Sequence, residues 1–159
     1  MLKAVFPGSF DPPTLGHLNI IERAGSLFDE LLVVVAENPR KKYLFSVEER
    51  VALIQELLRG QKKVKVYVWN SLIVEFMKPR DLHIIVRGVR GTDDFSYEFE
   101  LSMINKALDA TIETILMPTD PRYFVLRASA VKELAFFHGD VSSMVPPLVE
   151  EALQKKYPS

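Results

Sequence analysis

Apolar runs and helical patterns alternate along the whole chain. Five short runs, rich in β-branched residues, predict strands at residues 2–6, 31–36, 64–68, 83–86 and 111–117. Apolar residues three or four positions apart predict helices at about 18–28, 51–58, 72–76, 95–103, 129–137 and 147–156. Runs that are apolar on both faces favour a buried parallel sheet. The alternation therefore predicts an α/β fold, a doubly wound parallel five-stranded sheet in a single domain over 1–159, with a C-terminal helix at about 147–156.

Local signals support individual helices. Ser46 with Glu49 three residues later predicts a capping box, and Thr14 is expected to be the N-cap of the first helix. Phe95, Phe99 and Met103, each four residues apart, are expected to face the core.

Composition and charge exclude several classes of protein. Hydrophobic residues make up 48% and charged residues 26% of the chain, which is typical of a globular protein. The net charge of −1 predicts neither a nucleic-acid nor a membrane partner. Cysteine is absent, so the chain has no disulfides and no thiol catalysis. Pro7-Gly8 interrupt the first apolar run before a signal-peptide core forms, and we expect a cytoplasmic protein.

The loop after the first strand, residues 7–17, carries the most unusual chemistry. Ser9 offers a hydroxyl and a backbone N–H at the strand end, while Gly16 and His17 fall in the first turn of a helix. Free N–H groups and the positive end of the helix dipole favour phosphate there. In the alternative interpretation, His17 only caps its neighbours and Gly16 only eases packing.

Two arginines flank a glycine after the fourth strand, in Arg87-Gly88-Val89-Arg90. Ligands of doubly wound sheets bind beyond the carboxyl ends of the strands, and guanidinium groups match phosphate oxygens. We therefore expect Arg87 and Arg90 to bind phosphate. Lys41 occupies a similar place after the second strand, but its basic run is explained equally well as a solvated surface.

Two other polar residues have open alternatives. Glu98 either accepts a hydrogen bond from a ribose or adenine group or faces solvent on its helix. Ser129 either is a simple N-cap or binds phosphate together with nearby amides. The chain has no P-loop, no Gly-x-Gly-x-x-Gly, no nucleophile elbow and no cluster resembling a protein-built metal site. His83 and His138 are expected to be structural and surface residues, respectively.

Several spaced blocks resemble a known family. The run Gly8-Ser9-Phe10-Asp11-Pro12 with Thr14-x-Gly16-His17 resembles the nucleotidylyltransferase superfamily signature. Further blocks are similar, in order, to bacterial phosphopantetheine adenylyltransferases: Asn38-Pro39-x-Lys41-Lys42, Glu48-Glu49-Arg50, Arg87-Gly88-x-Arg90, Asp94-Phe95-x-Tyr97-Glu98, Val131-Lys132-Glu133 and Gly139-Asp140-Val141. The resemblance covers about residues 3 to 150 and implies a Rossmann-like nucleotidylyltransferase fold.

The resemblance also implies an activity. ATP and 4′-phosphopantetheine would react reversibly to give dephospho-coenzyme A and pyrophosphate, a step of coenzyme A synthesis, with Mg²⁺ carried in by ATP and a homohexameric assembly. It gives catalytic roles to His17, Lys41 and Arg90, and acceptor contacts to Ser9, Lys41, Ile73 and Arg87. The implied ATP contacts are Ser9, Phe10, His17, Gly88, Val89, Arg90, Glu98, Tyr123, Phe124, Val125, Leu126, Arg127, Ala128 and Ser129.

The chain departs from the family pattern in two places. Leu126-Arg127-Ala128-Ser129 stands where the family usually has Ile-Ser-Ser-Ser, and Arg90-Gly91-Thr92 stands where it usually has Arg-Ala. Arg127 either binds phosphate itself or turns away. Two alternative functions stay open: transfer to another phosphate acceptor, such as nicotinamide mononucleotide or glycerol phosphate, and a non-catalytic nucleotide-binding regulator.

Overall fold

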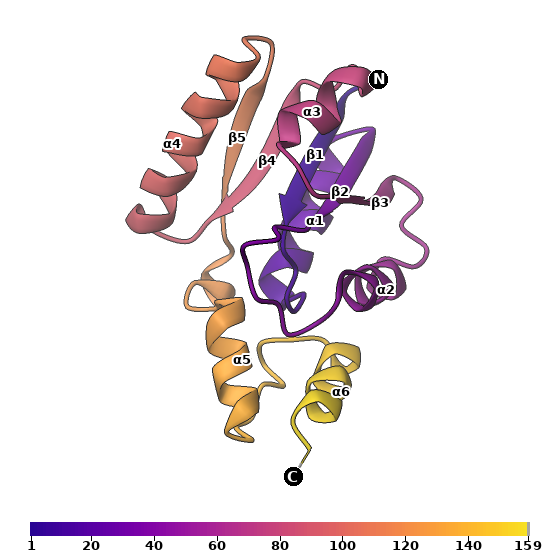
Figure 1. The fold of residues 1–159 in the computed structure, drawn as a ribbon, viewed down its shortest axis with the longest axis vertical. Coiled ribbons are helices and arrows are strands. Elements are labelled where there is room, and N and C mark those ends of the chain that lie inside the picture. Colours follow the sequence, from indigo (N-terminus) through magenta and orange to yellow (C-terminus); the bar gives the residue numbers. More distant parts are fainter. Residues whose placement is uncertain (159) are drawn as a thin grey trace.

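A computed structural model describes residues 1–158, and its centre is one five-stranded parallel sheet (Figure 1). The strand order is β3-β2-β1-β4-β5. The strands are β1 (Lys3–Gly8), β2 (Glu30–Ala36), β3 (Val64–Trp69), β4 (Ile84–Val89) and β5 (Glu113–Pro118). The predicted α/β class and the five parallel strands are confirmed.

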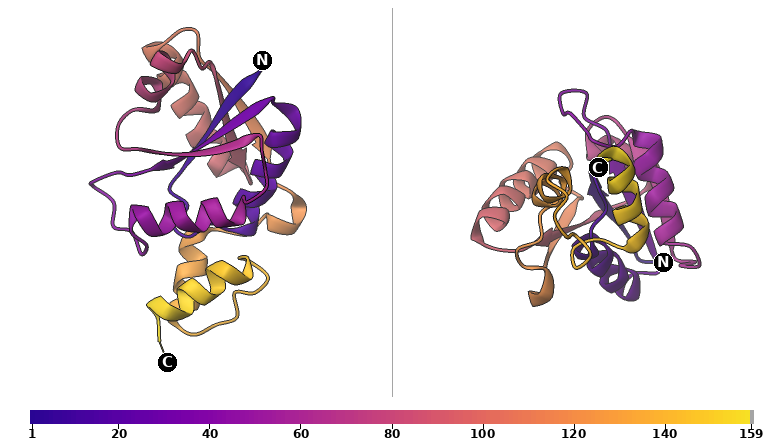
Figure 2. Two further views of the ribbon diagram at one scale, coloured as in Figure 1. Left: turned by 90° about the vertical axis from the view of Figure 1, so that its right-hand side faces the viewer. Right: turned by 90° about the horizontal axis from the view of Figure 1, so that it is seen from below.

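Four helices cover the two faces of the sheet. On one face, α1 (Leu15–Leu27) and α2 (Val47–Leu57) pack against the alternate strand residues that include Val33 and Val35. On the other, α3 (Ile73–Met77) packs against Val5, Val34 and their neighbours. Helix α4 (Thr92–Leu108) follows β4 toward the opposite edge of the sheet from α2 and, by the right-handed crossover rule, lies on the face of α3 (Figure 2).

The last two helices lie beyond the carboxyl ends of the strands (Figure 1). Helices α5 (Ala128–Phe136) and α6 (Pro147–Lys156) form a third apolar cluster with α2 and the buried ring of Phe45. Two short 3₁₀ turns, η1 (Lys78–Arg80) and η2 (Pro121–Tyr123), complete the connections. No helix within residues 1–158 is long and apolar enough to cross a bilayer.

Both predicted helix caps are present. The Ser46 hydroxyl accepts from the backbone N–H of Glu49, whose carboxylate accepts from the N–H of Ser46 at 2.8 Å. Thr14 caps α1 in the same reciprocal way, with His17 in the place of the glutamate. Of the two alternatives for Ser129, the N-cap is excluded, because α5 begins at Ala128 after Arg127 and Ser129 is its second residue.

The aromatic stripe of α4 is the main error of the sequence-based prediction. Phe95 and Phe99 are each 50% exposed and Met103 is 54% exposed, whereas Glu98 is the buried residue of this helix. The helix buries the face that carries the Arg87–Glu98 ion pair, so the row of Phe95, Phe99 and Met103 stays about half exposed beside that face. Strand β4 is also longer than predicted, and Arg87 and Gly88 belong to it.

Candidate active site

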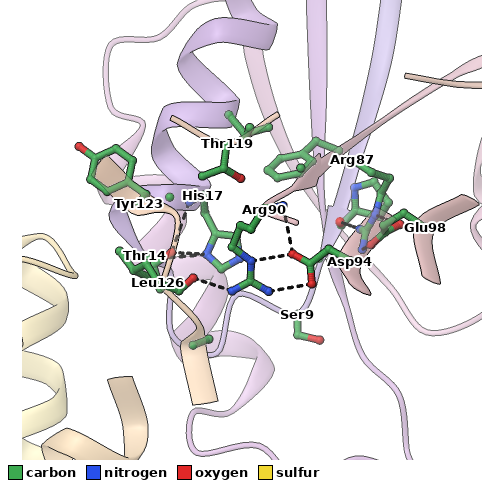
Figure 3. A pocket seen from close by; sticks show the side chains of 17 residues that line it. Ser9, Thr14, His17, Arg87, Arg90, Asp94, Glu98, Thr119, Tyr123 and Leu126 are labelled. Carbon is green, nitrogen blue, oxygen red and sulfur yellow. Dashed lines mark hydrogen bonds and ion pairs between the residues drawn. The ribbon is translucent and has the colours of Figure 1, made fainter. Parts of the chain in front are cut away.

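A cavity of about 270 Å³ opens at the carboxyl ends of β1 and β4 (Figure 3). The chain leaves these neighbouring strands toward opposite faces of the sheet, which creates the crevice where doubly wound folds bind ligands. Its lining includes Ser9, Thr14, Gly16, His17, Ile20, Arg87, Gly88, Arg90, Asp94, Glu98, Thr119, Tyr123, Leu126 and Ala128. The histidine and the two arginines singled out in the sequence therefore meet in one cavity.

The ring of His17 is fixed by the cap of its own helix. Its Nδ1 atom lies 3.0 Å from the backbone nitrogen of Thr14 and accepts that N–H. Nδ1 therefore carries no proton, and the proton of the neutral ring resides on Nε2. Burial, together with the charges of Arg87 and Arg90, lowers the pKa of His17 to about 4. At neutral pH the side chain is an uncharged hydrogen-bond donor at the edge of the cavity.

Phe10 supports this ring from behind. The Phe10 side chain is fully buried, and its ring centroid lies 5.0 Å from that of His17 in an edge-to-face arrangement. A Cβ atom on Gly8 would come within 3.0 Å of the Phe10 ring, which explains the glycine at the strand end. Phe10 adopts a φ of 49°, a left-handed conformation that costs a non-glycine residue about 1 kcal/mol.

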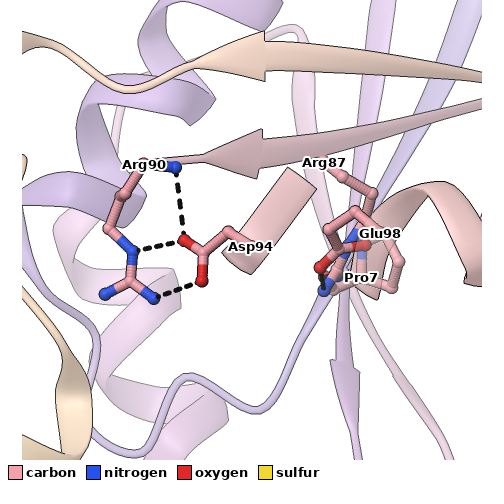
Figure 4. Close-up of polar contacts among 5 residues, drawn as sticks. All are labelled: Pro7, Arg87, Arg90, Asp94 and Glu98. Carbon is pink, nitrogen blue, oxygen red and sulfur yellow. Dashed lines mark hydrogen bonds and ion pairs between the residues drawn. The ribbon is translucent and has the colours of Figure 1, made fainter. Parts of the chain in front are cut away.

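Arg87 is held by a buried carboxylate (Figure 4). Its Nε and Nη2 atoms donate to the two carboxylate oxygens of Glu98, at 2.8 and 2.7 Å, and Nη1 donates to the backbone carbonyl of Pro7. Glu98 is 7% exposed, so this bidentate pair is shielded from water. The alternative that Glu98 faces solvent is excluded.

Arg90 forms the second pair of the cavity. Its Nε lies 2.7 Å from Oδ2 of Asp94 and its Nη1 donates to the carbonyl of Leu126 at 2.7 Å. Burial alone would raise the pKa of Asp94, but the hydrogen bonds and charge of Arg90 outweigh it, and the net shift is downward. Arg90 thus joins the start of α4 to the segment that follows β5.

Charge is balanced inside the cavity. The positive charges of Arg87 and Arg90 face the negative charges of Glu98 and Asp94 one to one. Each carboxylate occupies guanidinium N–H groups of the kind that phosphate oxygens use. The cavity therefore resembles a phosphate site whose donors are engaged by the protein's own anions.

Comparisons with known proteins agree with this geometry. Residues 5–134 match the cytidylyltransferase-like family. The chain is 47% identical over 156 residues to the phosphopantetheine adenylyltransferase of Treponema pallidum (strain Nichols), covering 98% of both chains. It is 43% identical to the enzyme of the same name from Caldanaerobacter subterraneus subsp. tengcongensis, covering 99% of this chain and 98% of the other. The chain belongs to the phosphopantetheine adenylyltransferase family.

A solved structure shares the fold. A putative nicotinate-nucleotide adenylyltransferase from Vibrio parahaemolyticus superimposes with a TM-score of 0.69, covering 100% of this chain and 98% of that one. At 17% identity this likeness shows the fold and leaves the acceptor open. As a phosphopantetheine adenylyltransferase family member, the chain is a nucleotidyltransferase related to coenzyme A synthesis.

The structure divides the contacts implied by the family into two groups. Ser9, His17, Arg87, Gly88, Arg90, Glu98, Tyr123, Leu126 and Ala128 line the cavity. Phe10, Lys41, Ile73, Val89, Phe124, Val125, Arg127 and Ser129 are not among the lining residues. Lys41 lies in the exposed loop after β2. Ile73 packs with the apolar cluster on the face of the sheet that α3 covers, opposite to the face of α1 and α2. Their roles in the family's reaction stay predictions.

Sequence reasoning missed two polar residues of the cavity, Asp94 and Thr119, as functional candidates. The spacing could have indicated Asp94, because it lies four positions after Arg90 and oppositely charged residues at this spacing meet at a helix start. Thr119 follows β5, and its N–H bonds to the carbonyl of Val89 at 2.8 Å, which brings it to the same edge of the sheet. No motif marked it.

Proposed function

We propose that this protein transfers the adenylyl group of ATP reversibly to 4′-phosphopantetheine, yielding dephospho-coenzyme A and pyrophosphate. The carrying observation is the cavity that brings a neutral His17, Arg87 and Arg90 together at the start of α1, in a chain 43–47% identical to enzymes of that name. We place the reaction in the cytoplasm.

The chemistry needs no base and no covalent enzyme intermediate. A phosphate oxygen of the acceptor attacks the α-phosphorus of ATP and forms a new P–O bond. The bond from that phosphorus to the β-phosphate oxygen breaks, and pyrophosphate leaves with the electron pair. Because the attacking phosphate is already anionic, catalysis consists of positioning and of stabilising negative charge. In-line attack inverts the configuration at phosphorus.

His17 suits the role of charge stabiliser. A neutral imidazole with its proton on Nε2 donates a hydrogen bond to an oxygen on the α-phosphorus, where negative charge accumulates in the transition state. The N–H groups of Leu15, His17 and Leu18 in the first turn of α1 already bind Met144 and Thr14, so we assign a phosphate contact to the backbone of Gly16, which lines the cavity. These donors are preorganised, since the Thr14 cap holds the ring before substrate arrives.

The two arginines act by exchanging partners. Phosphate groups of the substrates replace carboxylate oxygens on Arg87 and Arg90, which preserves the hydrogen bonding of both guanidinium groups. In this scheme the acceptor phosphate lies at Arg87, Ser9 and Lys41, with Ile73 toward the pantetheine chain. The carboxylate of Glu98, released from Arg87, is then free to accept a ribose hydroxyl.

The triphosphate side depends on Arg90 and the segment after β5. Tyr123, Leu126 and Ala128 line the cavity there, and Arg90 ties the segment in place through the Leu126 carbonyl. Arg127 is the N-cap of α5 and belongs to the same segment, and we assign it a supporting charge for the triphosphate. We assign the nucleotide contacts to this segment and to Gly88 and Val89.

We propose that Mg²⁺ enters as the Mg–ATP complex and is part of the substrate. No group of three or more His, Asp or Glu side chains able to hold a metal ion occurs among residues 1–158. The ion would neutralise part of the triphosphate charge, and the protein's cations would supply the rest.

The outward face of α4 supports self-association. Phe95, Phe99 and Met103 follow one another at four-residue spacing on this helix, and each is at least half exposed. A contiguous apolar row of this kind is typical of a protein interface. We propose a homohexamer, the number coming from the family resemblance and the interface from α4.

An acceptor panel tests the proposed function. The protein is mixed with Mg–ATP and, separately, 4′-phosphopantetheine, nicotinamide mononucleotide or glycerol phosphate, and products are identified by mass spectrometry. Dephospho-coenzyme A formed faster than the other products supports the proposal. Preference for another acceptor, or ATP binding with no product at all, would replace it with one of the two alternatives.

A further inference from the structure

Three charged side chains are buried in the described chain, and one of them has no opposite charge beside it. Asp11 pairs with Lys132 at 3.0 Å, and Glu98 pairs with Arg87 at 2.7 Å. Arg50 on α2 is 0% exposed and forms no ion pair with any residue in 1–158. A buried cation without a carboxylate is costly, so its surroundings need an explanation.

Backbone carbonyls and an aromatic face hold Arg50 instead. Its Nη1 atom donates to the carbonyl of Ser9 at 2.8 Å and to that of Ala36 at 2.9 Å. Its guanidinium carbon lies 4.0 Å from the ring centroid of Tyr43. The buried Nε and Nη2 atoms have no hydrogen-bond partner within the described chain.

These contacts fasten two neighbouring strand ends at the ligand edge. The paired register of β1 and β2 ends at Gly8 and Val35, and the next residues are Ser9, just after β1, and Ala36, the last residue of β2. Arg50 bridges them through one nitrogen where the strand ladder has stopped. One of these strand ends presents Ser9 to the cavity, and the other leads into the loop that carries Lys41.

The far end of that loop is fastened to the same segment. The carboxylate of buried Asp11 accepts the backbone N–H groups of Leu44 and Phe45, both at 2.9 Å. Residues 37–43 are therefore anchored at both ends to residues 9–11. The loop itself closes on Asn38, whose N–H donates to the Tyr43 hydroxyl and whose carbonyl accepts from the N–H of Lys41.

We infer that Arg50 is a positioning residue for the acceptor phosphate. It sets the distance between Ser9 and the Lys41 loop so that both reach one phosphate group, and its unpaired charge favours an anion at that place. This inference rests on the proposed function, because it deepens the acceptor half of the same site. It leaves the nucleotide half, at Arg90 and the segment after β5, to other residues.

Arg50→Lys tests the inference with the charge retained. A lysine has no planar fork and cannot reproduce the stacked, bridging geometry of the guanidinium. We expect 4′-phosphopantetheine to bind at least about 10-fold more weakly by calorimetry, while ATP affinity changes less than about twofold. The matched control is Arg59→Lys, an exposed arginine just after α2, which leaves both affinities unchanged.

The possible outcomes distinguish a failure of the proposed function from a failure of the Arg50 inference. Native protein that does not bind 4′-phosphopantetheine refutes the proposed function and this inference with it. Native binding that Arg50→Lys leaves unchanged, or equal losses for both substrates, overturns the inference alone. Should Arg50→Lys fail to fold, Tyr43→Leu removes the ring over the guanidinium, and unchanged acceptor affinity in that variant also overturns the inference.

Discussion

The Nδ1 atom of His17 and the backbone nitrogen of Thr14 are 3.0 Å apart, and this hydrogen bond fixes where the imidazole carries its proton. A single contact thus serves both the helix and the site. It completes the capping box of α1 and leaves Nε2 protonated for a ligand. The sequence left open whether His17 caps its helix or serves the site, and the structure shows that one ring can do both.

Removing the imidazole should slow the reaction strongly. We expect His17→Ala to lower kcat by at least about 100-fold, equivalent to about 3 kcal/mol of lost transition-state stabilisation, with a modest change in ATP affinity. Steady-state kinetics and ATP titration measure the two effects. The control is His138→Ala, which removes an exposed histidine and should retain the native rate. A near-native rate in His17→Ala would contradict the role.

The low pKa of His17 has a consequence for stability. The folded protein keeps this ring neutral down to about pH 4, whereas the unfolded chain binds its proton near pH 6.5. The unfolded state therefore holds more protons between these values, and stability falls as pH drops from 6.5 to 4, by at most about 1.4 kcal/mol per pH unit.

Denaturant unfolding at several pH values checks this sign. His17→Asn lacks the titrating ring, so its stability should fall less than that of the native protein between pH 6.5 and 4.5. Carboxylates with lowered pKa, such as Asp94, contribute equally to both proteins and cancel in the difference. Parallel curves for the two proteins would show that His17 titrates normally.

The Arg87–Glu98 pair should behave as a buried unit. Arg87→Met leaves the Glu98 carboxylate without its partner and should cost about 2–3 kcal/mol of unfolding free energy at pH 7. Adding Glu98→Gln should recover part of that loss, as a double-mutant cycle by chemical denaturation would show. The exposed Arg59–Glu56 pair is the control, and its cycle should give less than about 0.5 kcal/mol.

Lys41 should distinguish the two substrates. Because the proposed scheme places Lys41, on the loop after β2, at the acceptor phosphate and the nucleotide contacts elsewhere, we expect Lys41→Ala to raise the KM for 4′-phosphopantetheine much more than the KM for ATP. The neighbouring Lys42→Ala is a matched control of the same charge. Equal increases in both KM values would argue against an acceptor contact.

The α4 face should control assembly. A charge at the centre of the exposed aromatic row, introduced by Phe99→Glu, should dissociate the assembly into smaller species in analytical ultracentrifugation. Leu27→Glu, at the end of α1, also replaces an exposed apolar residue and should leave the assembly intact. An unchanged mass for Phe99→Glu would remove α4 from the interface.

The sequence predicted the fold closely because its patterns are local. The β-branched run of β2 and the Ser46 cap of α2 each specify an element within a few residues, and both appear as predicted. The stripe of Phe95 and Phe99 misled, since periodicity shows that residues share a face but not which side of the helix meets the sheet. The buried face of α4 carries Glu98, whose partner Arg87 lies eleven residues earlier on β4.

The sequence predicted which residues gather at the site, but not how their charges are paired. His17, Arg87 and Arg90 follow strand ends, and that rule alone brings them to one edge. The Arg87–Glu98 pair and the bridge from Arg50 to Ser9 join residues 11 and 41 positions apart, and no motif encodes such contacts. The Arg90–Asp94 pair, only four positions apart, was within reach of sequence reasoning. The sequence suggested a cationic rim, whereas the structure shows guanidinium groups balanced by Glu98 and Asp94.

Phosphorus NMR of one reaction mixture tests the central claim most directly. Native protein with Mg–ATP and 4′-phosphopantetheine should produce the diphosphate resonances of dephospho-coenzyme A together with an equal amount of pyrophosphate, and omitting the acceptor should abolish both. His17→Ala under the same conditions should show the same products at a rate lower by at least about 100-fold. Pyrophosphate released without acceptor, or no diphosphate ester from the native protein, would contradict the account.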